Sequence, residues 1–503
     1  MRFEIELPKP EIVVQESVPI KFRLVNGENP VSIPFEYNSS DVVTLLIFDN
    51  QEELIAQADG YASIARQGQP VRRAPQAELK TSELGAGQEM AWQEDLAAYL
   101  DIKNAGDYYV QAKFEFKPGD ISLQSSKVRL KVSENDCNWL DVLHDQVSMG
   151  MVYFVQQHDG QGETIFQVSN CSRPANSWKR GTVKLPPGSK PRVSEADFTA
   201  HDTFDHDFFR WLIGFNKDGL VATNFTESTG LGKFTVYTVQ QENAVMIGRP
   251  IQHIDKGVSV LMLAGDSERY KIFQLDFNST FGERGIRDLG TYGFMPEPVS
   301  VSSDWKGERY IVAGTNGNLP LRLIRARPDG QIIVSTKLSR SNLPGLAEDG
   351  GKNIKIKILS ALPDVKIYSA SVRAILASVL IEDKERKNLK LIRIPLPERE
   401  PDSSAAQVAD VPIDDRTLPD GEDIIYSDMV QTQRAELHVI FATSSGKLYY
   451  IRPGTGPQEI AAGDRERSSM ARLMVSTDGD IHLFFPEKGK GIGHKVLYKK
   501  PRR

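Results

Sequence analysis

Apolar and polar side chains alternate with a period of two along several segments near the start of the chain. In residues 20–24, Ile20, Phe22 and Leu24 alternate with Lys21 and Arg23, and the same pattern recurs over residues 108–116 and 127–132. Because successive side chains of a strand point to opposite faces, this pattern predicts half-buried antiparallel strands. A continuous apolar run over residues 42–48 is typical of a central strand in a sandwich.

The segment 104–110, Asn-Ala-Gly-Asp-Tyr-Tyr-Val, resembles the turn that enters a late strand of immunoglobulin-like and fibronectin-like domains. In those domains a tyrosine packs over the corner. The resemblance implies an immunoglobulin-like β-sandwich over residues 1–134. The Cys–Trp–Cys core of antibody domains is absent, and we expect Trp92 to lie in the sandwich core.

A strand-poor insertion is predicted from Asp59 to Gly85. Long loops in compact domains are often functional or disordered. This loop carries three arginines that we take as partner-binding candidates: Arg66, Arg72 and Arg73.

From residue 135 onward the pattern changes to recurring pairs of short apolar strands joined by polar or glycine turns, with little helical periodicity. Seven such hairpins can be placed at intervals of about 34 to 64 residues, with anchors at Val152, Leu212, Val260, Ile311, Ile375, Val439 and Leu473. Repeated strand units without helices indicate radial repetition, and a propeller blade needs roughly 40–50 residues. The sequence thus predicts an all-β protein whose residues 135–503 form a seven-bladed β-propeller. Six or eight blades stay open, and a β-helix is the alternative fold.

Two hairpins, at residues 437–450 and 476–485, resemble those of sialidase-like propellers, in which an aspartate-glycine turn (the Asp-box) lies between the outer strands of a blade. Here no tryptophan follows the turn, and the glycine comes early. The resemblance implies architecture rather than activity, because one fold hosts many functions.

Composition narrows the function classes. The chain has 503 residues, with 61 basic and 67 acidic side chains for a net charge of −6. A mean hydropathy of −0.35, and no apolar run near the roughly 20 residues that span a bilayer, argue against a transmembrane segment. The acidic balance argues against nucleic-acid binding. The N-terminus lacks the pattern of a signal peptide, so we expect a cytoplasmic protein or one exported by a dedicated route.

The two cysteines, Cys137 and Cys171, lie far apart without a second cysteine or histidine at metal-ligand spacing. This spacing favours two idle thiols over a zinc site, and a single disulfide stays open.

A short cluster of imidazoles and carboxylates, at residues 201–207, is the best metal candidate. His201, Asp205 and His206 could hold a divalent cation if distant ligands completed the geometry. The alternative interpretation is a solvated loop between blades, and no other cofactor is predicted.

Glycosidase chemistry would require two carboxylates facing each other across a pocket. Carboxylates such as Asp304 lie near predicted turns, where capping explains them. Candidate arginines for a substrate carboxylate, such as Arg210, Arg249, Arg322 and Arg393, are scattered along the chain and form no recognisable triad. No catalytic residue is assigned.

Charge is concentrated in two late segments. Residues 398–423 hold nine acidic residues and are predicted to form an exposed insertion between blades, in which Asp414, Asp415 and Asp420 could bind calcium. The C-terminal tail is basic from residue 488 onward, and its last basic residues are further partner-binding candidates: Lys499, Lys500, Arg502 and Arg503.

Together these patterns favour a non-catalytic binding or scaffold protein that is a structural or peripheral component of a multiprotein assembly, with other subunits as partners. The alternatives are a sialidase-like carbohydrate-active enzyme and a glycan-binding lectin. All three fit a sandwich joined to a propeller.

Overall fold

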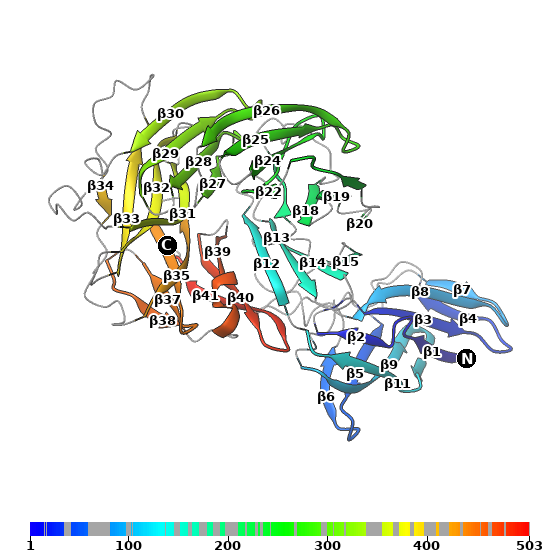
Figure 1. Cartoon of the computed structure of the whole chain (residues 1–503). Coiled ribbons are helices and arrows are strands. Elements are labelled where there is room, and N and C mark those ends of the chain that lie inside the picture. The colour runs from blue at the N-terminus through cyan, green and yellow to red at the C-terminus, as the bar shows by residue number, and fades with distance from the viewer. Residues whose placement is uncertain are drawn as a thin grey trace. The chain divides into compact units, whose positions relative to one another are not determined.

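The structure is a computed structural model of the whole chain (Figure 1). It describes residues 1–501 except 15, 17, 35–41, 59–80, 97–101, 103, 136, 145–150, 159–162, 171–178, 185–191, 197–209, 217–218, 227–229, 232–234, 242, 266–268, 293–298, 305, 316–317, 339–354, 366–371, 383–386, 397–408, 412–421, 433–435, 453, 461–464 and 477–478.

The protein is all-β, as predicted. Its described residues form strands and two short 3₁₀ helices, η4 (Lys117–Gly119) and η7 (Arg465–Met470). Among these residues no helix is long and apolar enough to cross a membrane.

The chain divides into two compact units. Unit 1 comprises Met1–Cys137, Ile165–Thr182 and Glu487–Ile492, and unit 2 comprises Asn138–Thr164, Val183–Pro486 and Gly493–Arg503. The sequence-based boundary at residue 134 stays a prediction.

Two sheets of unit 1 face each other over one core. The strands are β1 (Arg2–Glu6), β2 (Glu11–Val13), β3 (Pro19–Val25), β4 (Val31–Pro34), β5 (Val43–Phe48), β6 (Leu54–Ala58), β7 (Thr81–Leu84), β8 (Glu89–Asp95), β9 (Gly106–Phe116), β10 (Ile121–Gln124) and β11 (Val128–Ser133). One sheet has the order β1-β3-β8 and the other β2-β11-β9-β5-β6, with β10 added to β9. Phe22 of the first sheet and Phe114 of the second belong to the same buried cluster, so this part is a β-sandwich.

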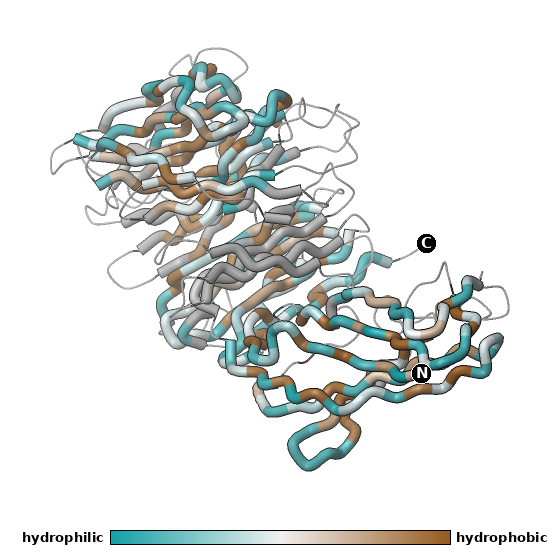
Figure 2. The backbone as a smooth tube through the Cα atoms, turned by 90° about the vertical axis from the view of Figure 1, so that its right-hand side faces the viewer, coloured by the Kyte–Doolittle hydropathy of each residue, from teal (hydrophilic) through white to brown (hydrophobic). Residues whose placement is uncertain are grey.

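The alternation found in the sequence directs side chains into this core. In β3 the residues at 20, 22 and 24 are fully buried, while Lys21 and Arg23 are exposed. Figure 2 shows the same alternation of hydrophobic and hydrophilic positions along the strands of unit 1. Trp92 is partly exposed and stacks on Phe22 with ring centroids 5.2 Å apart, so it packs against the core rather than inside it.

The predicted tyrosine corner is present. The Tyr108 hydroxyl donates a hydrogen bond to the carbonyl oxygen of Asn104 at 2.8 Å. The assignment of unit 1 to the immunoglobulin-like class stays a prediction. One boundary is corrected, because the insertion predicted to reach Gly85 ends earlier: Thr81–Leu84 form β7, which pairs with β4.

From β12 onward the described strands form seven separate sheets, as expected for a β-propeller. Their bounds are β12 (Cys137–His144), β13 (Met151–His158), β14 (Glu163–Asn170), β15 (Lys179–Lys184), β16 (Arg192–Val193), β17 (Glu195–Ala196), β18 (Arg210–Asn216), β19 (Gly219–Thr226), β20 (Gly230–Leu231), β21 (Thr235–Tyr237), β22 (Val245–Met246), β23 (Ile251–Gln252), β24 (Val258–Gly265), β25 (Tyr270–Phe277), β26 (Glu283–Tyr292), β27 (Val299–Ser303), β28 (Arg309–Thr315), β29 (Asn318–Ala326), β30 (Ile332–Leu338), β31 (Lys355–Val365), β32 (Val372–Glu382), β33 (Lys387–Pro395), β34 (Ala409–Val411), β35 (Ile424–Gln431), β36 (Leu437–Thr443), β37 (Leu448–Ile451), β38 (Gln458–Ile460), β39 (Arg472–Val475), β40 (Ile481–Glu487) and β41 (Gly491–Tyr498).

Each predicted hairpin anchor lies in a different one of these sheets, in β13, β18, β24, β28, β32, β36 or β39. The sheets of unit 2 follow one another around a common centre (Figure 1), and the first strands β27, β31, β35 and β39 contact one another in that order. The first strands therefore line the centre. The acidic segment needs one correction, because Ala409–Val411 within it form β34, which pairs with β33.

One turn type closes many of the hairpins in both units. In the turn that begins at Asp304, Oδ1 accepts the backbone N–H groups of Lys306 and Glu308, while Gly307 adopts a φ of 75°. Asp49 and Asn278 cap their turns in the same way. Aspartate and asparagine favour such turns because their side chains hydrogen-bond the backbone two residues on. The turn at Ser476 joins β39 to β40, the first two strands of their sheet.

Candidate functional site

Most of the residues singled out from the sequence lie outside the described part of the chain. This applies to the metal candidates His201, Asp205 and His206, to the partner-binding candidates Arg66, Arg72, Arg73, Arg502 and Arg503, and to the calcium candidates Asp414, Asp415 and Asp420. The described residues contain no group of three or more His, Cys, Asp or Glu side chains arranged to hold a metal ion.

The start of the basic tail is held against a turn of unit 2. The backbone N–H of Lys500 donates to Oδ1 of Asp480 at 2.8 Å, and Lys499 is exposed. At the end of the acidic segment, hydrogen bonds from Thr443, Lys447 and Ser445 lower the pKa of Glu422 to about 2. The described ends of both charged segments are thus engaged within unit 2.

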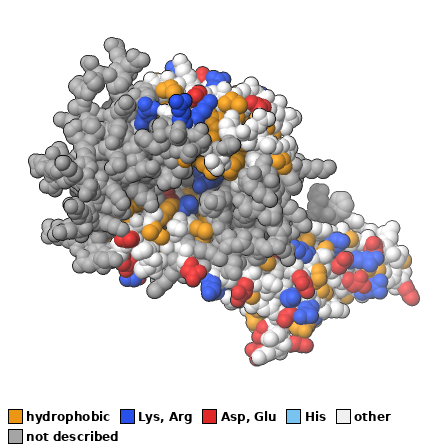
Figure 3. Space-filling model, in the orientation of Figure 1, with side chains coloured by type: hydrophobic (Ala, Val, Ile, Leu, Met, Phe, Trp, Pro, Cys, Tyr) orange, Lys and Arg blue, Asp and Glu red, His pale blue; other side chains and the backbone are white. Residues whose placement is uncertain are grey.

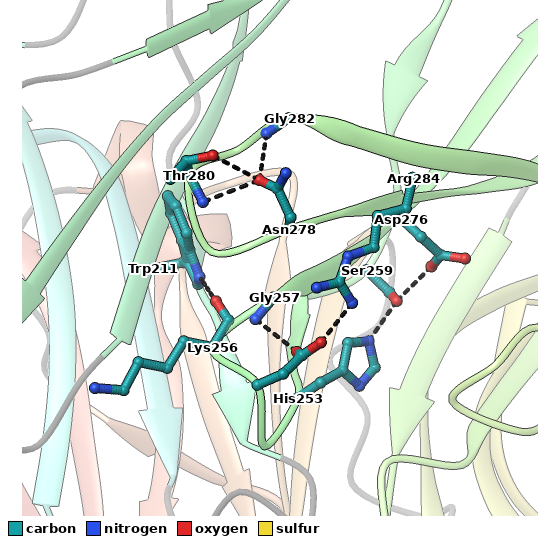
Figure 4. A network of polar contacts seen from close by, with 11 residues as sticks. Trp211, His253, Lys256, Gly257, Ser259, Asp276, Asn278, Thr280, Gly282 and Arg284 are labelled. Carbon is teal, nitrogen blue, oxygen red and sulfur yellow. Dashed lines mark hydrogen bonds and ion pairs between the residues drawn. The ribbon is translucent and has the colours of Figure 1, made fainter.

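A polar network that includes His253, Ser259 and Asp276 lies at the third sheet of the propeller (Figure 4). Ser259 is the second residue of β24 and is fully buried. Its hydroxyl oxygen lies 2.6 Å from Nε2 of His253 and 2.6 Å from Oδ1 of Asp276. Gln274 also donates to Asp276, at 2.8 Å.

The same network reaches across to the next sheet. Gln274 Nε2 donates to the carbonyl oxygen of Pro328 at 2.9 Å, and Arg309 of β28 donates to the carbonyl oxygen of Ser259 at 2.8 Å. These bonds fasten the β24–β25 hairpin to the sheet of β27–β30. Buried hydrogen bonds of this kind help to fix neighbouring sheets relative to each other.

The order of contacts in this network differs from that of a nucleophilic triad. A triad places histidine between serine and carboxylate, where it accepts the serine proton. Here the single hydroxyl proton of Ser259 goes to Asp276, so His253 must donate to the serine oxygen. Because Ser259 is also sealed from solvent, the network supports the packing of two blades rather than acyl transfer.

The sequence analysis named Asp304 as a carboxylate near a predicted turn. Its contacts in the structure are those of a residue that caps a turn. It caps its own turn, and its Oδ2 lies 3.1 Å from the Tyr310 hydroxyl. Burial and the neighbouring charge of Glu308 raise the pKa of Asp304. Arg325 binds Glu308 at 2.7 Å and balances part of this negative charge.

A second charged group lies at the centre of unit 2. Asp428 of β35 accepts the backbone N–H of Leu473 in β39 at 2.8 Å through Oδ2. Arg472, the first residue of β39, donates to the Tyr426 hydroxyl at 2.5 Å, and its guanidinium lies 4.9 Å from the centroid of the same ring. The neighbouring strands β35 and β39 thus carry a carboxylate (Asp428), a guanidinium group (Arg472) and a phenol (Tyr426) close to one another.

Arg249 is a further basic residue whose charge acts on Asp428. It lies just before β23 and donates a hydrogen bond to the carbonyl oxygen of Val142 in β12. This hydrogen bond joins the segment before β23 to the sheet of β12–β15. Figure 3 draws Lys and Arg side chains of the described residues in blue on the face turned toward the viewer.

The charges of both arginines act on the Asp428 carboxyl. Loss of hydration raises the pKa of the Asp428 carboxyl, and the positive charges of Arg472 and Arg249 oppose that shift. We refer to Arg249, Tyr426, Asp428 and Arg472 as the axial cluster; all four side chains are partly exposed. Sequence reasoning named Arg249 as a candidate but missed the other three, because no local motif marks them.

Comparisons with known proteins are limited to structures. No protein-family model matches the chain, and no curated protein matches it. Three similar solved structures are a mutant of the Aleuria aurantia lectin with a fucosylated ligand (10% identity, TM-score 0.34, covering 65% of this chain and 96% of the lectin), a polysaccharide lyase acting on ulvan (10%, 0.39, 73% and 95%) and BBS1N in complex with ARL6DN (11%, 0.38, 73% and 94%).

Proposed function

We propose that the protein is a non-catalytic binding protein, a peripheral component of a larger assembly that docks onto another protein subunit through strand β6 of unit 1. The observation that carries this proposal is the exposure of two adjacent large apolar side chains on that strand. Leu54 is 51% exposed and Ile55 is 52% exposed. Burying such side chains against a partner is favourable by roughly 1.5–3 kcal/mol each.

The position of β6 in its sheet supports strand addition. Among the described strands, β6 is the last in the order β2-β11-β9-β5-β6. The outer side of an edge strand presents backbone N–H and C=O groups that can pair with an extended segment of another chain. Backbone pairing would provide affinity, and the two apolar side chains would provide contact area.

Exposed charged side chains pair with one another on both sheets of unit 1, whereas the exposed Leu54 and Ile55 of β6 are apolar. On the sheet of β1 and β3, exposed charges pair with one another, as in the contact of Arg23 with Glu89. The segment that carries Arg66, Arg72 and Arg73 begins directly after β6. The partner-binding candidates from the sequence and the exposed strand are therefore adjacent in the chain.

The test is purification of the tagged full-length protein under mild conditions, followed by cross-linking mass spectrometry. We expect a stoichiometric partner whose cross-links fall near β6, and an at least tenfold loss of that partner in the double variant Leu54→Lys/Ile55→Lys. The matched control is Ile286→Lys, which changes a side chain of unit 2 that is 47% exposed.

Two results would overturn the proposal: recovery of the wild-type protein alone, or undiminished partner binding by the double variant. In either case the lectin and enzyme alternatives would be examined with a glycan array and a glycoside panel.

A further inference from the structure

We propose that strand β41 is a docking edge for an acidic, extended segment of another protein, which adds to the last propeller sheet as a fourth strand. The residues concerned are 493–498 of β41, and we refer to them as the β41 edge. This surface lies in unit 2, and its use does not depend on the proposed role of β6.

The last sheet of the propeller has fewer described strands than the others. Its order is β39-β40-β41 (Figure 1), whereas each of the other six propeller sheets has four to six described strands. In the three sheets that precede it, the fourth strand pairs antiparallel with the third, as β30 does with β29, β34 with β33 and β38 with β37. Because a propeller blade is a four-stranded sheet, the place beside β41 is where a fourth strand belongs.

The chain pairs with the start of β41 through one residue, Asn135. Its backbone N–H donates to the carbonyl oxygen of Gly489 at 3.0 Å, and its carbonyl oxygen accepts the N–H of Gly491 at 2.9 Å. Asn135 is followed by β12, which belongs to a different sheet. Among the described strands, β40 is therefore the one that pairs with the β41 edge, and it does so from one side.

The β41 edge is held in place by contacts of its own side chains. Nε2 of His494 lies 2.8 Å from Nδ1 of His482 in β40, and the two rings stack with centroids 5.1 Å apart. The ring centroid of Tyr498 lies 5.4 Å from that of His438 in the neighbouring sheet. Because the strand is already ordered, an added segment has mainly its own conformational freedom to lose, which favours affinity.

Charge identifies the kind of partner. Residues 487–500 contain five lysines and one glutamate, which leaves +4 with histidine neutral, in a chain whose net charge is −6. Lys495 and Lys499 are exposed, and among the described residues no carboxylate forms an ion pair with either. On β26, the edge strand of the third sheet, Arg284 by contrast pairs with Asp255. The lysines at β41 are thus available to the carboxylates of another chain.

Lysines on an edge strand also have a protective effect. They oppose the pairing of identical edges from two copies of a protein, because like charges repel. The same charges attract an acidic segment and speed its encounter with the strand. Charge therefore favours an acidic partner over a second copy of this chain.

The alternation of side chains along β41 defines the pattern that the partner needs. Lys495 and Leu497 lie on one face of the strand, and Lys499, directly after the strand, continues this alternation. Leu497 is partly exposed. Side chains that lie opposite each other on paired strands interact, and opposite charges stabilise such pairs. The matching segment has carboxylates four positions apart, with an apolar side chain midway between them.

Fluorescence anisotropy of the full-length protein tests the proposal with a labelled peptide of this pattern, Thr-Glu-Thr-Val-Thr-Glu-Thr. We expect saturable binding of this peptide. Replacement of both glutamates by lysine should weaken binding at least tenfold. N-methylation of two consecutive central residues should have an effect of the same size, because it removes backbone donors from both edges of the peptide without changing its charge. It therefore separates strand pairing from charge attraction.

Lys495→Glu tests the strand itself and is expected to weaken binding of the peptide at least tenfold. Lys21→Glu is the matched control, because Lys21 is an exposed strand lysine whose strand, β3, is paired on both sides by β1 and β8. It makes the same change in net charge and should leave binding unchanged. Hydrogen–deuterium exchange of the wild type should slow in residues 493–498 when the peptide is bound. Thermal unfolding establishes that each variant is folded.

The proposal would be overturned if the peptide did not bind in a saturable way at millimolar concentration, or if the N-methylated peptide bound as tightly. Equal binding by folded Lys495→Glu and Lys21→Glu, or protection from exchange outside residues 493–498, would also overturn it. Dimerisation of the wild type that is lost in Lys495→Glu would assign the β41 edge to a second copy of this chain instead.

Discussion

Nδ1 of His438 lies 2.7 Å from the hydroxyl oxygen of Tyr450, and the two rings stack with centroids 5.9 Å apart. His438 is on β36 and Tyr450 on β37, within the core between the last two sheets. Burial lowers the pKa of His438 to about 4, and the positive charge of Arg452 acts in the same direction. The folded protein therefore holds this histidine neutral at pH values where an exposed histidine would be protonated.

This pair predicts a specific pH dependence of stability. Between pH 6.5 and 4 the unfolded chain binds a proton on His438 that the folded chain does not bind, so the free energy of unfolding falls as the pH falls through this window. The full shift corresponds to roughly 3 kcal/mol. We expect His438→Gln to reduce the dependence of Tm on pH between these limits without abolishing it, because burial also lowers the pKa of His494 to about 4.

Tyr450→Phe is the matched control for that measurement. It removes the hydrogen bond but keeps the titrating histidine, so it should lower Tm while leaving the dependence on pH in place. An identical pH dependence in wild type and His438→Gln would contradict the prediction.

The network at Ser259 predicts a stability effect without an effect on chemistry. Ser259→Ala removes the buried hydroxyl that links His253 to Asp276, and each of these two partly buried groups loses that hydrogen-bond partner. An unsatisfied buried polar group costs about 1–3 kcal/mol. Chemical denaturation should show a loss of this size for Ser259→Ala and almost none for Ser279→Ala, which alters an exposed serine in the adjacent turn. Equal stability of the two variants would show that the network contributes nothing measurable.

The hairpin of β18 and β19 depends on a glycine. Gly219 has a φ of 127°, and a Cβ atom there would lie 2.3 Å from the carbonyl oxygen of Tyr237. Because that oxygen belongs to the backbone of β21, relief requires movement of a strand. Gly219→Ala should lower the free energy of unfolding by at least about 1 kcal/mol.

Gly285→Ala is the control for that substitution, because a Cβ atom at Gly285 would meet nothing within 4 Å. It should change stability by less than about 0.5 kcal/mol. Urea denaturation of both variants measures the difference. An unchanged free energy of unfolding in Gly219→Ala would contradict the prediction and would show that β21 can shift to make room for the Cβ atom.

The tyrosine corner predicts an effect confined to unit 1. Tyr108→Phe removes the hydrogen bond to the Asn104 carbonyl oxygen, which should cost about 1 kcal/mol. Hydrogen–deuterium exchange should then accelerate in peptides from β9 and β11 but not in peptides from unit 2. Tyr109→Phe, which changes the adjacent and less buried ring, should leave exchange unchanged. Faster exchange in both variants would assign the effect to ring packing instead.

The sequence by itself determined the local elements of this protein. Alternation of side chains over residues 20–24 and 108–116 identified β3 and β9, and the seven hairpin anchors fell in seven different sheets. These features are readable because strand periodicity and turn chemistry depend on residues within a few positions of one another.

Tertiary structure alone decided which distant side chains meet. Nothing in the sequence around Arg249 indicates that it contacts the strand of Val142 or that its charge acts on Asp428. Likewise, the spacing of Ser259, Gln274 and Arg309 does not reveal the bonds that join their sheets. Such contacts depend on how the sheets close around a centre, and that closure is set by the packing of whole blades rather than by any local pattern.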